Sequence, residues 1–197
     1  MRYFVITGHK AVTTGDFKLD DIAGGAGRLD ILVRCVNSAF FLSHDLRRDV
    51  EIYLVCEGGN DPVKTVMFKG SELRYLNPDE RSTSSLIRNA LLKPLGEGMT
   101  KSSPGVYVGR YTFDDVLRML SEKGKFVYLK EDGEDCRGFG FPENPIFVLG
   151  DNQDLTEEEE SALLGYGPGR ISIGPNSLHA DHCMIVVQNE LDRREAS

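Results

Sequence analysis

The chain has 197 residues, a mass of 21.9 kDa and 40% hydrophobic residues, enough for one well-packed domain. Its 23 Lys and Arg face 31 Asp and Glu, and the net charge of -8 argues against a generic basic nucleic-acid coat protein. The cysteines at 35, 56, 136 and 183 have no paired spacing, which favours neither a zinc knuckle nor a disulfide framework.

The excess of negative charge is confined to the second half of the chain. Residues 1–27 carry three charges of each sign, and residues 28–93 carry ten basic and nine acidic side chains. Residues 94–197 carry ten basic and nineteen acidic side chains. The near-neutral first half is therefore the part of the chain that can approach a nucleic acid.

No segment has the length and composition of a membrane anchor. The longest apolar runs, such as residues 39–42 and 184–187, are too short to cross a bilayer, and the first ten residues lack the apolar core of a signal peptide. We expect a soluble cytoplasmic protein that makes no contact with a membrane.

Short runs of β-branched and aromatic residues, bounded by Gly, Pro, Asn or Asp, predict seven strands. In chain order these strands are residues 3–6, 50–55, 65–68, 106–108, 126–129, 146–149 and 171–173.

Five segments have helical spacing. In residues 29–42, one face carries Leu29, Leu32, Val33, Val36, Ala39 and Phe40. The second helix starts at Asn77 or Pro78 and stops before Pro94, and the third runs from Thr112 to Gly124. The fourth begins at Thr156, with Glu159 at the spacing of a capping box, and the last covers about residues 179–193.

This alternation of strands and helices predicts an α/β fold with a mostly parallel sheet, covered by helices on both faces. No repeat or low-complexity segment is visible, so we expect a single domain over residues 1–197.

Three loops that follow predicted strands are the first candidates for a binding site, because ligands of α/β sheets bind beyond the carboxyl ends of strands. Strand 126–129 leads into KEDGEDC, strand 146–149 into GDN and strand 171–173 into GPNS. Gly150 and Gly174 permit a positive φ or the close approach of a ligand, although ordinary turns also use glycine there.

The segments FVLGDNQDLTEEE and ISIGPNSLHADHCMIVVQNEL together resemble the last two motifs of the SPOUT methyltransferases. The matching residues are Leu149, Gly150, Ile173, Gly174, Ser177 and the helix from His179. The segments AGRLDILVRCVNSAFFLSHDLRRDVEIYLV and FKGSELRYLNPDERSTSSLIRNAL resemble the archaeal tRNA pseudouridine-54 N1-methyltransferases. Arg28-Leu29-Asp30 also resembles a segment of the related ribosomal-RNA enzyme, and the resemblance covers residues 1–93 and 125–193.

The resemblance implies a C-terminal trefoil knot, a homodimer, and S-adenosylmethionine (SAM) bound in the knot loops. Carried over by position, it implies that the cofactor contacts Leu129, Gly150, Ile173, Gly174, Pro175, Asn176, Ser177, Leu178 and Cys183. Apolar side chains would pack on the adenine faces while backbone groups read its edge. His179 stands near the position of an Asn in many SPOUT proteins, which bears on the target nucleotide more than on the cofactor.

Methyl transfer from a sulfonium is an in-line displacement, so the protein mainly has to hold the reactants near attack distance. N1 of pseudouridine carries a proton that must leave. Asp30 is the candidate for orienting the base or accepting this proton, and Arg28 for donating to a phosphate or carbonyl. The alternative is that Arg28 and Asp30 form an ion pair at the start of a helix.

Seven of the ten basic residues in 28–93 are arginine, the better type for phosphate binding and base stacking. They are Arg28, Arg34, Arg47, Arg48, Arg74, Arg81 and Arg88. Arg28, Arg47 and Arg81 are the predicted RNA contacts, although several of the seven will form solvated ion pairs.

Two other features have competing interpretations. Cys183 is either a nucleophile toward a pyrimidine carbon or a small side chain packed on the cofactor. Methyl transfer to a nitrogen does not need a thiolate nucleophile, so the packing role is preferred. Gly24-Gly25-Ala26-Gly27 is either an anion nest or a flexible lid, without the further residues of a P-loop or GxGxxG motif.

We expect the protein to bind no metal, and the cluster of His179, Asp181, His182 and Cys183 does not change this expectation. On a helix Asp181 points away from the face that the two histidines share, and no further ligand with metal spacing appears.

The resemblance thus implies a SAM-dependent tRNA methyltransferase that acts as a dimer and makes 1-methylpseudouridine at position 54 in the T-arm. The alternatives are the same chemistry on ribosomal RNA, and a knotted RNA-binding protein that transfers no methyl group.

Overall fold

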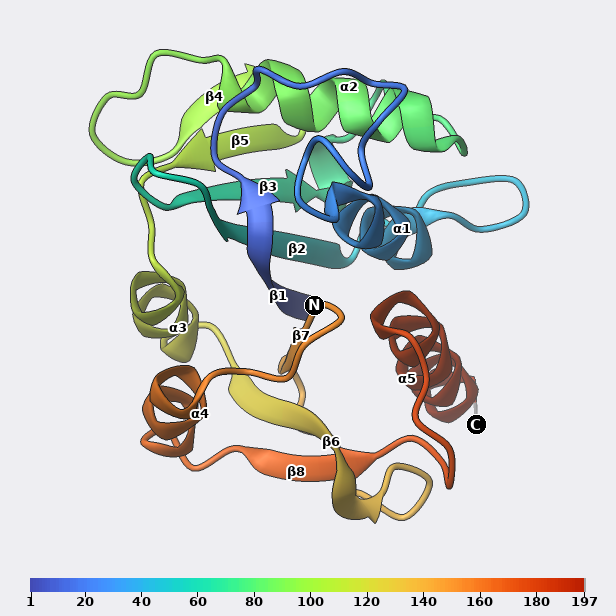
Figure 1. Cartoon of the computed structure of the whole chain (residues 1–197). Coiled ribbons are helices and arrows are strands. Elements are labelled where there is room, and N and C mark those ends of the chain that lie inside the picture. Colours follow the sequence, from blue (N-terminus) through green and yellow to red (C-terminus); the bar gives the residue numbers. More distant parts are fainter. Residues whose placement is uncertain (197) are drawn as a thin grey trace.

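The computed structural model describes residues 1–196, and an eight-stranded sheet forms its centre (Figure 1). The strand order is β4-β5-β3-β2-β1-β7-β6-β8. β1 (Arg2–Val12) pairs in parallel with β2 (Val50–Gly58) on one side and with β7 (Pro145–Gly150) on the other. β6 (Lys125–Asp135) and β8 (Gly169–Ser172) continue the parallel part.

The other edge of the sheet is antiparallel. β3 (Lys64–Lys69) returns beside β2 and is followed by the short 3-10 helix η1 (Gly70–Glu72). β5 (Val106–Gly109) and β4 (Thr100–Ser103) complete this edge. The prediction of a mostly parallel sheet is therefore confirmed for five strands, with a three-stranded antiparallel extension.

Helices cover both faces of the sheet, as predicted. α1 (Leu29–Phe40), α2 (Glu80–Leu91) and α5 (Ala180–Glu195) pack on one face, and α3 (Phe113–Ser121) and α4 (Glu157–Leu164) on the other. No helix among residues 1–196 is long and apolar enough to cross a membrane.

The alternation of side chains along β1 divides the core into two parts. Phe4 and Ile6 are buried beneath α1 and α5, whereas Tyr3 and Val5 belong to the cluster under α3 and α4. The expected apolar face of α1 is fully buried.

Side-chain caps fix where three helices begin. The predicted capping box of α4 is present: Glu159 N donates to Thr156 Oγ1 over 3.2 Å, and Thr156 N donates to the Glu159 carboxylate over 2.7 Å. α3 has the same arrangement at Thr112. α2 begins after Asp79, whose side chain accepts from Ser82 N, so the predicted start at Asn77 or Pro78 was one to two residues early.

Two further boundaries differ from the prediction. β4 was not predicted, because its sequence TKSS is polar and lies at an exposed sheet edge, where apolar residues are not required. β8 ends at Ser172, so Ile173 belongs to the following loop instead of the predicted strand.

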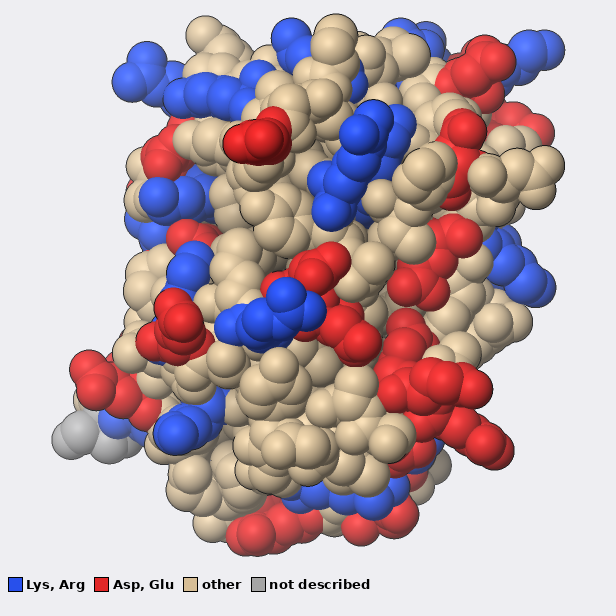
Figure 2. Space-filling view, turned by 90° about the vertical axis from the view of Figure 1, so that its left-hand side faces the viewer, with Lys and Arg blue, Asp and Glu red and all other residues tan. Residues whose placement is uncertain are grey.

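The surface reflects the uneven charge of the two halves of the chain. Figure 2, which faces the side of α3 and α4, shows acidic side chains gathered in a patch at the lower right and many Lys and Arg side chains near the top. The first turn of α4 has four consecutive glutamates, of which Glu157 and Glu158 are exposed, Glu160 is half-buried and Glu159 is buried.

Candidate active site

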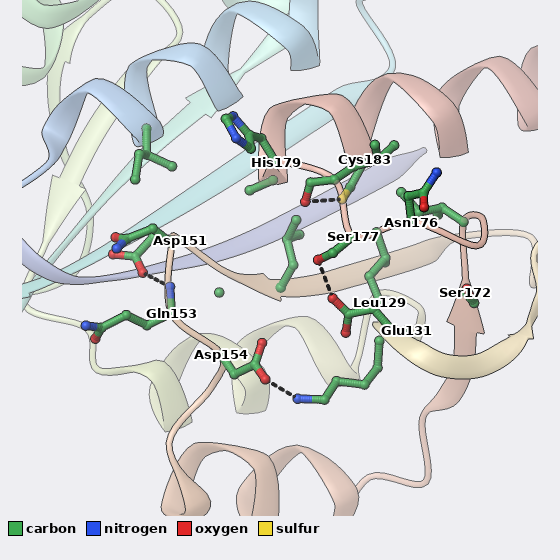
Figure 3. A pocket seen from close by; sticks show the side chains of 18 of the residues that line it. Leu129, Glu131, Asp151, Gln153, Asp154, Ser172, Asn176, Ser177, His179 and Cys183 are labelled. Atoms are coloured by element: carbon green, nitrogen blue, oxygen red, sulfur yellow. Dashed lines mark hydrogen bonds and ion pairs between the residues drawn. The ribbon is translucent and has the colours of Figure 1, made fainter.

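A cavity of about 550 Å³ lies where the ends of β7 and β8 and the middle of β6 meet the first turns of α1 and α5 (Figure 3). This is the carboxyl end of the parallel strands, where ligands of α/β sheets bind. The volume is within the range of pockets for small molecules and cofactors.

The loop after β7 forms one wall through a tight turn at Gly150. A Cβ atom at this position would clash with the backbone oxygen of Gln153, so the turn requires glycine. Asp151 Oδ1 accepts from Gln153 N over 2.9 Å and stabilises the turn from within. Asp154 follows and accepts from Lys130 Nζ of β6 over 2.6 Å.

The loop between β8 and α5 forms the opposite wall. Gly174 adopts a φ of 156°, and Ser172 Oγ donates to its carbonyl oxygen over 3.1 Å. Ser177 Oγ donates to Glu131 Oε1 over 2.7 Å, which ties this loop to β6 (Figure 3). This hydrogen bond lowers the pKa of Glu131, so the cavity keeps a negative charge on this side.

Apolar side chains line the cavity between these polar groups. Leu129 comes from the middle of β6 and Leu149 from the end of β7. Ile173 and Leu178 lie in the loop between β8 and α5, and Leu178 is 41% exposed. Cys183 is half-buried on α5, and burial raises the pKa of its thiol to about 11. The thiol is therefore protonated at neutral pH, which favours the packing role over the nucleophile.

α1 closes the cavity with a charged first turn. Arg28 has a φ of 65°, in the left-handed region that is uncommon for residues other than glycine. Its guanidinium donates twice to Asp30, over 2.9 Å and 3.1 Å, and Arg34 donates to the same carboxylate over 2.9 Å. Arg28 and Arg34 line the cavity, whereas Asp30 lies behind them with only 7% exposure.

The electrostatics of Asp30 follow from this arrangement. Burial alone would raise its pKa, but the hydrogen bonds from Arg28 and Arg34 outweigh burial and leave the pKa below its ordinary value. The ion pair that was the alternative interpretation of these residues is thus present, and both carboxylate oxygens are engaged by guanidinium groups.

Comparison with known proteins identifies the family. A family model described as "Putative SAM-dependent RNA methyltransferase" matches residues 1–196. The chain belongs to this family. A tRNA (pseudouridine(54)-N(1))-methyltransferase of Haloferax volcanii is 53% identical over 98% of the chain and 96% of the relative. The protein of the same name from Methanococcoides burtonii is 50% identical over the same shares of the two chains.

The fold of this RNA methyltransferase also matches a solved structure. The crystal structure of Archaeoglobus fulgidus Nep1 bound to S-adenosylhomocysteine has a TM-score of 0.66 and is 16% identical, over 100% of this chain and 98% of that one. At this identity the likeness concerns the fold alone, and it agrees with the resemblance to SPOUT methyltransferases.

The cavity of the methyltransferase collects most of the residues predicted to hold the cofactor. Lining residues include Leu129, Gly150, Ile173, Gly174, Asn176, Ser177, Leu178 and Cys183. Pro175 is the exception: it lines a second cavity on the outer side of the same loop, beside Ile185 of α5.

The three predicted RNA-binding arginines lie in different surroundings. Arg28 is 43% exposed at the cavity. Arg47 is only 14% exposed and donates to Asp192 of α5 over 2.8 Å, so its guanidinium is engaged within the protein. Arg81 is largely exposed and pairs with Asp20. Neither Arg47 nor Arg81 is among the described residues that line the cavity.

Sequence reasoning missed the polar lining of the cavity. The cavity is also lined by Glu131, Asp151, Gln153 and Asp154, which were not among the predicted contacts. All four lie in the loops that follow predicted strands. Their position directly after buried strands was the available signal.

Proposed function

We propose that the protein methylates N1 of pseudouridine 54 in tRNA and that the cavity described above binds SAM, the methyl donor. The family is SAM-dependent, and close relatives over the whole chain carry this tRNA activity in their names. The observation that supports the site is the cavity with an apolar and acidic lining on one side and two arginines on the other.

The residues of the cavity fit SAM in both shape and charge. The side chains of Leu129, Ile173 and Leu178 offer apolar surfaces for the adenine ring. The carboxylates of Glu131 and Asp151 would attract the positively charged ammonium and sulfonium groups. When bound, SAM supplies an electrophilic methyl group on its positively charged sulfur.

Arg28 is the residue that we assign to the RNA substrate. Its guanidinium lies at the cavity, partly exposed, and the left-handed backbone together with Asp30 fixes its direction. There it donates to a phosphate or to a ring carbonyl of the target base, and it stabilises the negative charge that develops as N1 loses its proton. Arg34 adds positive charge beside it.

Asp30 is a positioning residue in this proposal. Its lowered pKa makes the carboxylate a weak base, and two arginines already occupy its oxygens. We therefore assign Asp30 to the orientation of Arg28 in preference to proton transfer, the other role predicted for it.

The activity is tested by incorporation of a labelled methyl group from SAM into a T-arm RNA with pseudouridine at position 54. The matched control is the same RNA with uridine there. We expect label in the first RNA only. No label in either RNA would favour the knotted RNA-binding protein without transferase activity.

Ribosomal RNA is the alternative substrate. Mass mapping of nucleosides in purified tRNA and rRNA from a deletion strain separates the two targets. We expect 1-methylpseudouridine to disappear from tRNA, and unchanged tRNA with altered rRNA would contradict the assignment.

We also infer that the protein forms a homodimer through the outer face of α5. Ile185 is 51% exposed there and lines two cavities, one with Pro175 and Val186 and one with Phe41. Light scattering on the purified protein measures the mass. Ile185→Glu should give a monomer, whereas Leu164→Glu, at an equally exposed leucine of α4, should leave the dimer intact.

The C-terminal trefoil knot implied by the resemblance stays a prediction.

A further inference from the structure

Beside the cofactor cavity, three potential metal ligands from distant parts of the chain lie together. They are His9 near the end of β1, Glu57 near the end of β2 and Glu159 in the first turn of α4. One possible ligand atom from each lies within 4.8 Å of the others. β1 and β2 are neighbouring parallel strands, so the sheet itself brings His9 and Glu57 to the same edge.

Neither glutamate side chain has a Lys or Arg partner among the described residues. Glu159 is 8% exposed, and its Oε1 atom is buried without a hydrogen-bond partner among residues 1–196. Glu57 is half-buried and has neither a hydrogen bond nor an ion pair to any described residue. A buried carboxylate oxygen without a partner is unfavourable, so the site calls for a cation.

The imidazole of His9 is held in the orientation of a metal ligand. Its Nε2 atom lies 2.9 Å from Glu159 Oε2, on the side of the two glutamates. Its Nδ1 atom lies 3.4 Å from Asp151 Oδ1, whose side chain is 2% exposed. Metal-binding histidines commonly contact a carboxylate through the second ring nitrogen, which fixes the ring and its tautomer.

We propose that His9, Glu57 and Glu159 bind one divalent transition-metal ion, with Zn²⁺ as the best match. One imidazole nitrogen and two carboxylates suit Zn²⁺ or Mn²⁺ better than Mg²⁺ or Ca²⁺, which prefer oxygen ligands alone. Bonds of about 2.1 Å at tetrahedral angles place ligand atoms roughly 3.4 Å apart, so three atoms within 4.8 Å of one another can reach one ion after small side-chain movements.

The ion has a structural role in this proposal. It neutralises the two glutamates and joins β1, β2 and α4 at one point. Through His9 it also fixes Asp151, which stabilises the turn at Gly150 and lines the cofactor cavity. The site does not depend on the proposed substrate, since it takes no part in methyl transfer.

Calorimetric titration of the full chain tests the proposal, after dialysis against a chelator and then against metal-free buffer. We expect one Zn²⁺ per chain in the wild type. Glu57→Gln, which keeps the size of the side chain and removes its charge, should weaken binding at least tenfold. Glu97→Gln, at an exposed glutamate of a distant loop, is the matched control and should bind like the wild type.

Two measurements keep the result interpretable. Circular dichroism establishes that Glu57→Gln is folded, and in the wild type alone Zn²⁺ should raise the melting temperature. His182→Ala changes a histidine that stacks on His179, away from the proposed ligands, and it should leave the stoichiometry unchanged. Absence of stoichiometric Zn²⁺ binding, or binding lost in His182→Ala and retained in Glu57→Gln, would overturn the proposal.

Discussion

The two sides of the cavity differ in charge and in what holds them. On the α1 side, Arg28 and Arg34 share the single carboxylate of Asp30, so positive charge remains. On the side of the strand loops, Glu131, Asp151 and Asp154 supply three carboxylates. Lys130 is the one lysine or arginine among the described residues that lines this side, so acidic groups prevail. The α1 side suits an anionic RNA, and the loop side suits a cationic cofactor.

This difference explains how an acidic protein can act on RNA. The residues of the positive side belong to the near-neutral first half of the chain, and those of the negative side to the acidic second half. In the proposed function, the α1 side binds RNA and the loop side binds the cofactor. Substitutions on the α1 side should therefore change RNA binding and methyl transfer, and those on the loop side should change cofactor affinity.

The largest expected effect is on the loop side. Gly150→Val introduces a side chain that clashes with the Gln153 backbone and should weaken S-adenosylhomocysteine binding at least a hundredfold in calorimetry. Gly140→Val is the matched control, because no atom lies within 4 Å of a Cβ there. Undiminished cofactor binding by a folded Gly150→Val protein would contradict the assignment of the pocket.

On the α1 side, Asp30→Asn should lower methyl transfer to the T-arm about ten- to a hundredfold while cofactor affinity changes less than about threefold, because it releases Arg28. Single-turnover assays and calorimetry measure the two quantities. Asp20→Asn, at the exposed partner of Arg81, serves as control. If Asp30→Asn lowers only the melting temperature, the ion pair is structural alone.

A smaller effect separates two arginines that the sequence placed together. Arg28→Ala should weaken T-arm binding about three- to tenfold and reduce its salt dependence, as measured by filter binding. Arg47→Ala should leave RNA affinity nearly unchanged and lower the free energy of unfolding by about 1 kcal/mol, because it removes the contact with Asp192. The reverse result would restore Arg47 as an RNA contact.

The last prediction concerns pH. The pKa of Asp30 is lower in the folded protein than in the unfolded chain, so its charge stabilises the fold at any pH above the unfolded value of about 3.9. This contribution, about 1–2 kcal/mol, is lost as pH falls through the folded pKa. The difference in melting temperature between wild type and Asp30→Asn should therefore be constant from pH 8 to 5 and vanish in acid. If the difference in melting temperature grows toward acid pH, the charge of Asp30 does not stabilise the fold in this way.

Local signals in the sequence predicted most of the fold. The apolar face of α1 and the capping boxes at Thr112 and Thr156 depend on residues close in the chain, and each is present. The glycine at 150 was recognised because it directly follows a buried strand. These features require no knowledge of the tertiary structure.

The missing parts depend on contacts between distant residues. Nothing near Arg47 in the sequence announces its partner Asp192, and His9, Glu57 and Glu159 are brought together only by the sheet and α4. Polar loop residues such as Asp151 look like ordinary surface until the strands that carry them are placed side by side.

The central position of β1 has a consequence for how the protein is made. β1 can pair with β2 early in synthesis, but its other neighbour, β7, is about 140 residues further along the chain. Until β7 leaves the ribosome, one edge of β1, whose first seven residues are buried in the folded protein, stays open to wrong partners. The cofactor cavity, built mainly from residues 129–183, is then the last part of the molecule to form. A chain that ends before β7 therefore lacks most of the residues that line the cavity.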